Sequence, residues 1–206
     1  MCKYCEMEAA TQRCSRCKTS WYCSADCQLS DWSFHKTQCK PAQIQGVIIH
    51  DEEARKSQPD GRIFESITID KKHPIHKEGV IPSSTAAYGV PLMVYRLKPY
   101  SVHELEPENR VATNLMVDKV WGMPPFDWEH YVGTVIVIRK DGSPLTPEGL
   151  ECLWKFHESL LKTWNERPND IPPKLTKYNL DDFCRTYRLA RIRDGQERFR
   201  GLELPL

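Results

Sequence analysis

Eight side chains that can bind a metal ion lie within the first forty residues of this 206-residue chain. They form four pairs with short internal spacings: two Cys-x2-Cys, one Cys-x3-Cys and one His-x3-Cys. In chain order the pairs are Cys2 and Cys5, Cys14 and Cys17, Cys23 and Cys27, and His35 and Cys39. Ligands separated by two residues converge on one ion, and ligands four residues apart share one face of a helical turn.

The chemistry of these ligands indicates which metal they hold. Thiolates and imidazole favour zinc over calcium or magnesium, which prefer oxygen ligands. Eight ligands complete two four-coordinate sites and leave no position for a reactive water, so we predict two structural Zn²⁺ ions. Disulfides are the alternative for clustered cysteines. The sequence shows no basic-then-apolar signal segment, so we expect an intracellular protein, in the nucleus or cytoplasm, where paired cysteines indicate metal.

Beyond the ligands, the second half of this segment resembles a MYND finger. The matching stretch reads Trp21-Tyr22-Cys23-Ser24-x2-Cys27-Gln28-x3-Trp32-x2-His35-Lys36-x2-Cys39. The HIT finger has its histidine closer to the sixth ligand and lacks the Gln-x3-Trp pattern, and a RING has a histidine in the middle of its ligand series. We therefore interpret residues 1–40 as a MYND-type zinc finger.

The resemblance implies how the ligands are shared between the two ions. MYND fingers are cross-braced, so that alternate pairs bind the same ion. Carried over, one ion is bound by Cys2, Cys5, Cys23 and Cys27, and the other by Cys14, Cys17, His35 and Cys39. Sequential pairing of neighbouring ligands is the alternative, which the spacing alone leaves open.

The resemblance also implies a protein-interaction role, because MYND fingers of known function dock short proline-containing peptides in a shallow groove. The matching contact positions are Ser15, Gln28 and Trp32. Gln28 and Trp32 share a helix face; an indole offers a flat apolar surface to proline rings, and an amide both donates and accepts hydrogen bonds. The alternative is that Trp32 packs in the small core between the zinc sites.

The rest of the chain reads as a linker followed by a second domain. Residues 41–60 are polar and lead into a Pro-Asp-Gly turn, which predicts a linker. Residues 61–206 begin with segments of strand character and continue with segments of helical period, which predicts a small α+β domain. The predicted strands lie within residues 62–69, 91–97, 110–118 and 133–139.

Two helices are predicted after the strands. Thr146 is a suitable N-cap for the first, whose apolar residues recur at three and four up to Trp164; Pro168 prevents its continuation. The second begins at Asn179 and ends at Gly195.

Part of this second domain resembles, more loosely, the C-terminal region of short fungal MYND-finger proteins. The shared stretches are Ala112-Thr113-x-Leu115-Met116, Trp128-x3-Tyr131-Val132-Gly133, Val137-x-Arg139-Lys140-Asp141 and Pro144-Leu145-Thr146. That group has no assigned activity, so the resemblance supports the architecture and implies no chemistry.

Charge and hydropathy argue against nucleic-acid and membrane partners. The net charge of the chain is +1. Residues 1–40 carry six basic and four acidic side chains; with two zinc ions and seven thiolates their net charge is −1, a poor match for phosphates. The longest apolar run, 132–138, is strand-sized and far shorter than the roughly 20 residues that cross a bilayer.

The catalytic candidates outside the finger are weak. The Asn-His-Ser-Cys segment of SET-type methyltransferases, a Gly-rich phosphate loop and a Gly-x-Ser-x-Gly elbow are all missing. Polar groups with alternative structural explanations are a loop cluster (Asp70, His73, His76), a histidine on an apolar helix face (His157), two separate thiols (Cys152, Cys184) and an arginine run in the last helix. We therefore expect a non-catalytic adaptor; the alternative is an enzyme of unknown class carried by residues 61–206.

Removing zinc is expected to unfold residues 1–40. So short a segment buries too little apolar surface to offset chain entropy, whereas structural zinc contributes on the order of 10–16 kcal/mol per site in small fingers. Amide NMR spectra recorded with a strong chelator should lose the dispersed signals of the finger and regain them with excess Zn²⁺. Dispersed finger signals that persist without metal would contradict this expectation.

Overall fold

The structure is a computed structural model that describes residues 1–39, 43–166 and 174–202, with the side chains of 164–166 left out. The chain divides into two compact units. The first comprises Met1–Ile44 with Ile69–His73, and the second comprises Gln45–Thr68 with Pro74–Leu206.

The first unit contains a short hairpin and one helix. Strands β1 (Gln12–Arg13) and β2 (Trp21–Tyr22) pair antiparallel. Helix α1 (Ala25–Gln38) begins after Ser24, whose hydroxyl accepts a hydrogen bond from the backbone N–H of Cys27 at 3.2 Å. Because Leu29 and Phe34 of α1 are both more than 70% exposed, this helix lacks the continuous apolar stripe that usually attaches a helix to its domain.

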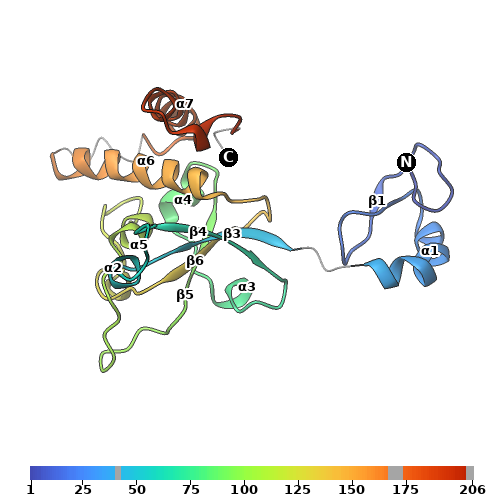
Figure 1. Ribbon diagram of the computed structural model, residues 1–206, viewed down its shortest axis with the longest axis horizontal. Coiled ribbons are helices and arrows are strands. Elements are labelled where there is room, and N and C mark those ends of the chain that lie inside the picture. Colours follow the sequence, from blue (N-terminus) through green and yellow to red (C-terminus); the bar gives the residue numbers. More distant parts are fainter. Residues whose placement is uncertain (40–42, 167–173, 203–206) are drawn as a thin grey trace. The chain divides into compact units, whose positions relative to one another are not determined.

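The second unit is built on a four-stranded sheet in the order β4-β3-β6-β5 (Figure 1). Its strands are β3 (Ile44–Ile49), β4 (Phe64–Ile69), β5 (Leu92–Arg96) and β6 (Val135–Arg139). Strand β6 is antiparallel to both β3 and β5. The register places Val137 opposite Val47 on one side and Val94 on the other, and all three valines are fully buried.

Among the described residues, two long helices lie on one side of this sheet. Figure 1 shows α6 (Pro147–Glu166) lying over the sheet, with α7 (Lys177–Arg193) beyond it. Helix α6 packs against α7 and against α5 (Arg110–Leu115). The shorter helices are α2 (Glu52–Lys56), α3 (Ile75–Glu78), α4 (Ser83–Ala87) and the 3-10 turns Phe126–Trp128 and Glu197–Phe199.

Most of the predicted elements are confirmed. Strands β4, β5 and β6 lie within three of the four predicted strand segments. The hydroxyl of Thr146 accepts the N–H of Gly149 at 3.1 Å, as expected of an N-cap. Helix α7 begins two residues earlier than predicted, because Thr176 caps it through the N–H of Asn179. The side chain of Trp164 and the whole of Pro168 lie outside the described residues.

The predicted linker over 41–60 is wrong for its described part. Residues 44–49 form β3, which lies between β4 and β6, and residues 52–56 form α2. The close approach of β6 explains why residue 46 of this strand is a glycine. A Cβ at Gly46 would lie 2.6 Å from the carbonyl oxygen of Val137. Residues 41 and 42 lie outside the described residues.

The predicted strand over 110–118 is also wrong, because residues 110–115 form helix α5. Asn109 starts this helix: its side-chain oxygen accepts the N–H of Ala112 at 3.1 Å. Its side-chain amide donates to the carbonyls of Ile49 and Gly133, at 3.2 and 2.8 Å. One buried Asn side chain thus caps α5 and holds it against the ends of two separate segments.

A buried histidine joins three elements of the second unit. The Nδ1 of His157 lies 3.0 Å from the carbonyl oxygen of Asn114, and its Nε2 lies 2.9 Å from the hydroxyl of Tyr88. Since a carbonyl can only accept, Nδ1 carries the proton and Nε2 accepts from Tyr88. Burial lowers the pKa of His157 to about 4, against an ordinary value of 6.5.

Two buried thiols meet between α6 and α7. The Sγ atoms of Cys152 and Cys184 lie 2.8 Å apart, and both residues are almost fully buried. The neighbouring Cys184 thiol and burial both raise the pKa of Cys152 far above its ordinary value. Cys152 is therefore a neutral packing thiol at physiological pH.

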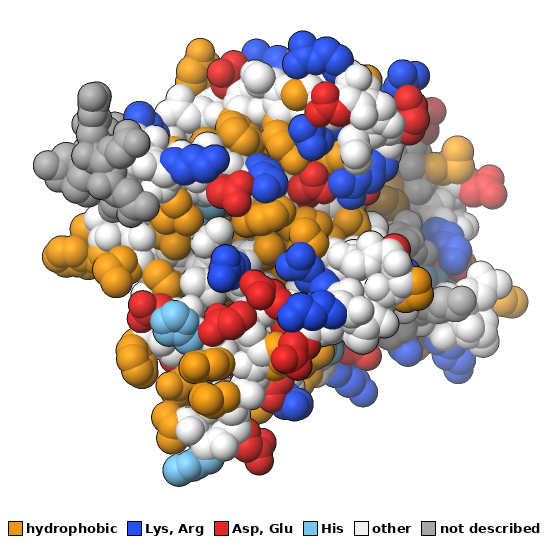
Figure 2. All heavy atoms as spheres, turned by 60° about the vertical axis from the view of Figure 1, so that its left-hand side comes forward, with side chains coloured by type: hydrophobic (Ala, Val, Ile, Leu, Met, Phe, Trp, Pro, Cys, Tyr) orange, Lys and Arg blue, Asp and Glu red, His pale blue; other side chains and the backbone are white. Residues whose placement is uncertain are grey.

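The surface of the second unit carries charges of both signs. Figure 2 shows Lys and Arg side chains intermixed with Asp and Glu over the face that it presents. The arginines near the end of the chain are also paired with acidic side chains. In α7, Arg185 pairs with Asp182, and Arg191 pairs with Asp194 just after the helix. Arg198, in the 3-10 turn that follows α7, pairs with Glu151. None of the helices in the described residues combines the length and apolar character needed to cross a bilayer.

We predict that the second unit loses stability as the pH falls from about 6.5 to about 4. The unfolded state binds a proton at His157 in this window and the folded state does not, so stability is complete above pH 6.5 and decreases toward pH 4, by about 3 kcal/mol. Denaturant unfolding of wild type and His157→Gln across this range measures the difference. Both proteins keep the same finger, so acid release of metal cancels; parallel profiles would show that His157 is not responsible.

Candidate metal centres and the adjoining hollow

The eight predicted ligands come together as two separate clusters. One contains Cys2, Cys5, Cys23 and Cys27, and the other contains Cys14, Cys17, His35 and Cys39. Within each cluster the four ligand atoms all lie within 4.8 Å of one another. Each cluster takes alternate pairs along the chain, which is the cross-braced arrangement and excludes the sequential one.

The spacing of the ligand atoms fits tetrahedral zinc. With Zn–S bonds of about 2.3 Å and Zn–N bonds of about 2.0 Å, a tetrahedron separates two sulfurs by about 3.8 Å and a sulfur from a nitrogen by about 3.5 Å. The Sγ atoms of Cys14 and Cys39 are 3.8 Å apart, and those of Cys5 and Cys23 are 3.5 Å apart. The Nε2 of His35 lies 3.5 Å from Cys17 Sγ, which identifies it as the ligand nitrogen.

Both Cys-x2-Cys turns have the same backbone geometry. Glu6 and Lys18, which directly follow the second cysteine of each turn, have φ of 60° and 59°. Their N–H groups donate to the carbonyls of Cys2 and Cys14, at 3.0 Å in each case. Residues other than glycine rarely adopt this left-handed conformation, so the two clusters impose the same constraint on two unrelated side chains.

The protonation equilibria of the thiols show why each cluster needs a cation. Burial raises the pKa of Cys2, but hydrogen bonds from the backbone N–H groups of Cys5, Tyr4 and Cys23 outweigh it and lower the pKa to about 6. Hydrogen bonding with the neighbouring thiols of Cys27 and Cys5 raises the pKa of Cys23 to about 12. Some sulfurs are thus prepared as thiolates, while full ionisation of the group requires a positive ion at its centre.

The second cluster shows the same contrast. Burial raises the pKa of Cys17, but hydrogen bonds from Thr19 and Ser20 outweigh it and lower the pKa to about 5. Burial, followed by the Cys14 thiol, raises the pKa of Cys39 to about 11. A divalent ion bound by three thiolates and one imidazole would favour the ionised forms.

Ser20 is the group that orients the histidine ligand. When Nε2 binds the metal, Nδ1 carries a proton and needs an acceptor. The Oγ of Ser20 lies 3.4 Å from Nδ1, whereas the Lys3 ammonium at 3.3 Å can only donate. Ser20 is buried and is therefore the acceptor consistent with metal bound at Nε2.

A tyrosine on the hairpin fixes helix α1 independently of the metal. Tyr22 is fully buried, and its hydroxyl donates to the carboxylate of Asp31 on α1 at 2.7 Å. The ring of Tyr22 also meets that of His35 edge to face, with centroids 6.1 Å apart. Neither Asp31 nor Ser20 was predicted, because a single polar residue next to a ligand has no spacing pattern that would reveal it.

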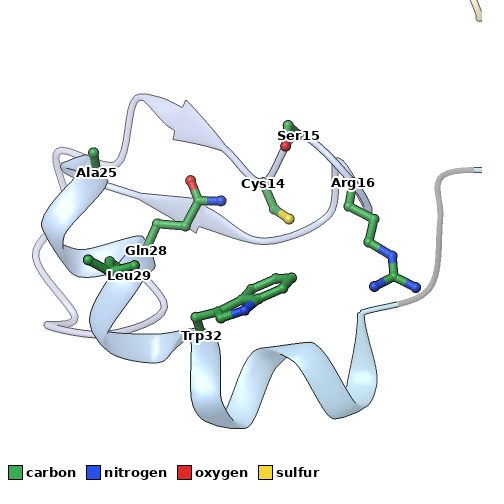
Figure 3. Close-up of a pocket in the computed structure, with 7 residues that line it drawn as sticks. All are labelled: Cys14, Ser15, Arg16, Ala25, Gln28, Leu29 and Trp32. Atoms are coloured by element: carbon green, nitrogen blue, oxygen red, sulfur yellow. The ribbon is translucent and has the colours of Figure 1, made fainter.

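The three predicted peptide-contact residues border one surface hollow. It has a volume of about 260 Å³ and lies between α1 and the Cys14–Cys17 turn. Figure 3 shows Gln28 and Trp32 pointing into it from α1, with Ser15 on the opposite side. The full lining is Cys14, Ser15, Arg16, Ala25, Gln28, Leu29 and Trp32.

Trp32 belongs both to the hollow and to the core beside the metal. Its ring packs edge to face on His35, with centroids 5.9 Å apart, and it contacts the buried residues around the clusters. The side chain also lines the hollow. The two interpretations of Trp32 offered by the sequence are therefore compatible.

The polar loop cluster noted in the sequence does not form a metal site. Among the described residues, the two cysteine clusters are the groups of three or more potential ligands that lie close enough to share an ion. Asp70, His73 and His76 do not form such a group; the carboxylate of Asp70 accepts the backbone N–H of Lys72 at 2.7 Å.

Residues 2–39 match the family model described as MYND finger, which covers all eight ligands. Residues 2–39 are a MYND finger. The MYND finger is a protein-interaction domain.

The matches to curated relatives are short. The SET domain and MYND-type zinc finger protein 6 of Schizosaccharomyces pombe is 51% identical over 43 residues, 20% of this chain and 9% of the relative. Human N-lysine methyltransferase SMYD2 is 39% identical over 46 residues, 22% and 11% of the two chains. Mouse Tudor domain-containing protein 1 is 58% identical over 31 residues, 15% and 3%.

The matched regions thus span about a tenth or less of these relatives. No solved structure matches this chain. The activities that the relatives' names describe therefore cannot be carried over from these matches.

Replacing Ser20 should weaken the second metal cluster selectively. Removing a hydrogen-bond partner of a metal-bound histidine typically costs about 10- to 100-fold in metal affinity. Given the long contact of 3.4 Å, we expect Ser20→Ala to lose about tenfold at one of the two zinc sites, measured by competition with a chromogenic chelator. Ser33→Ala, an exposed change on α1, is the matched control. Release of both zinc ions at wild-type chelator concentrations would show that Ser20 does not support His35.

Proposed function

We propose that this protein is a zinc-dependent adaptor whose MYND finger holds a proline-containing peptide in the hollow beside α1. The observation that carries the proposal is the convergence of Ser15, Gln28 and Trp32 on that one hollow. The indole offers a flat face to proline rings, and the amide of the half-buried Gln28, which lines the hollow, can bond to the backbone of an extended peptide.

The apolar part of the hollow complements these groups. Leu29 is 75% exposed and lies with Ala25 at the end of the hollow opposite Arg16 (Figure 3). An exposed leucine beside a half-buried tryptophan on a small domain provides apolar surface that a ligand can cover. Since His35 holds Trp32 in place, the metal cluster defines the shape of the binding surface.

The same proposal assigns no catalytic role to the second unit. Both ring nitrogens of His157 are occupied by hydrogen bonds in the core. Cys152 and Cys184 face each other in the interior, where a thiolate is disfavoured. Seven of the nine cysteines belong to the two metal clusters and none forms a disulfide, in keeping with a nuclear or cytoplasmic protein.

Binding of the zinc-loaded protein to a displayed library of proline-containing peptides tests the adaptor function. Selective enrichment should be lost in Gln28→Ala/Trp32→Ala. Because Trp32 also packs on His35, we pair that variant with Leu29→Glu, an exposed change that should abolish enrichment without disturbing the core. Zinc content near two ions per chain is the control for folding.

Two results would contradict the proposal. One is a library that shows no enrichment of proline-containing peptides by the zinc-loaded protein. The other is enrichment that survives both variants while two zinc ions remain bound. Either would leave the MYND finger as a structural module and direct the search for function to the second unit.

A further inference from the structure

One end of the hollow is positively charged. Arg16 is the one charged residue among those that line it, and it is exposed. Figure 3 shows its guanidinium beyond the ring of Trp32, at the end of the hollow far from Ala25. None of the ion pairs formed by the described residues includes Arg16, so its charge is available to a ligand.

A second cation lies along the same helix face. Lys36 is in the last turn of α1, four residues after Trp32, so it follows Trp32 on the same face of the helix. It is exposed and also forms no ion pair within the described residues. Along this face of α1, the surface therefore changes from apolar at Ala25 and Leu29, through the indole of Trp32, to basic at the C-terminal end of the helix.

The metal cluster makes the charge uneven along the hollow. Cys14, which also lines the hollow, belongs to the cluster of three cysteines and one histidine. Three thiolates around Zn²⁺ leave a net charge of −1 there, which disfavours an acidic group near Cys14. An acidic ligand group is therefore favoured beyond Trp32, beside Arg16, and disfavoured in the middle of the hollow.

We propose that Arg16, with Lys36, selects proline-containing peptides that carry an Asp or Glu next to the proline segment, at the end that passes Trp32. The inference rests on the proposed function, because it names a feature of the peptide bound in the same hollow. It adds a charge requirement that neither the MYND resemblance nor the apolar lining specifies. A carboxylate can accept two N–H groups of a guanidinium at once, which fixes the direction of the peptide as well as its composition.

The expected size of the effect is modest, because the pair is exposed to solvent. Exposed ion pairs change binding about two- to fivefold, with a larger share in the association rate at low salt. The charge preference should therefore appear as selectivity among peptides that all bind, and it should weaken as the salt concentration rises.

A displayed library with a fixed pair of prolines and randomised flanking positions tests this. The full-length, zinc-loaded chain is compared with Arg16→Glu, which reverses the charge at the hollow, and Lys162→Glu, which makes the same change at an exposed position of α6. Wild type and Lys162→Glu should enrich Asp or Glu on one flank, and Arg16→Glu should enrich Lys or Arg there.

An enriched peptide and its Glu→Gln version then give the magnitude. Wild type should bind the Gln version about two- to fivefold more weakly, and Arg16→Ala should bind the two versions equally, in fluorescence anisotropy at low salt. Proline enrichment with the same flanking charges in wild type and Arg16→Glu would overturn the role of Arg16 and leave peptide binding intact. Absence of any proline enrichment would overturn both proposals.

Discussion

The sharing of eight ligands between two interleaved metal clusters is the constraint on which the MYND finger depends. Each cluster takes one ligand pair from the first half of the segment and one from the second, so neither half can form a complete site alone. Helix α1 shows the consequence most clearly. It exposes Leu29 and Phe34 and is held by Cys27, by His35 and by the Tyr22–Asp31 hydrogen bond rather than by an apolar stripe.

The hollow that we propose as the peptide-binding surface depends on the same clusters for its geometry. Trp32 packs on the histidine ligand with one part of its ring and lines the hollow with another. Cys14 is both a cluster member and a lining residue. A surface built in this way has little freedom to adjust to a ligand, which would lower the entropy cost of binding the extended peptide that we propose. Proline-containing segments have the same property, because their backbone is already restricted.

Sequence reasoning succeeded where a geometric constraint leaves a fixed spacing. The eight ligands stand in four pairs whose short spacings let both members reach one ion, so all eight could be identified from the sequence. The cross-braced pairing came from family resemblance. It failed where two structures share one pattern. Val111, Leu115 and Val117 alternate as in a strand. The segment nevertheless forms helix α5, capped by Asn109, and this helix buries Val111, Ala112 and Leu115.

Strand β3 was missed because Gly46 and a short apolar run resemble a linker. The glycine is in fact required by the close approach of β6. Ser20 and Asp31 act through single hydrogen bonds, which leave no pattern in one sequence.

The interleaving of the clusters also sets an order in time. The ligands of one cluster end at Cys27, whereas those of the other end at Cys39, twelve positions later. Because the chain leaves the ribosome from its N-terminus, the first set of four ligands emerges before the histidine ligand of the second set. An ion bound at that stage closes a chain loop that contains Cys14 and Cys17. This restricts the positions that the two thiols can take before His35 and Cys39 join them. The order of the ligands along the chain thus favours stepwise metal binding. The first ion reduces the number of chain conformations that the ligands of the second ion must sample.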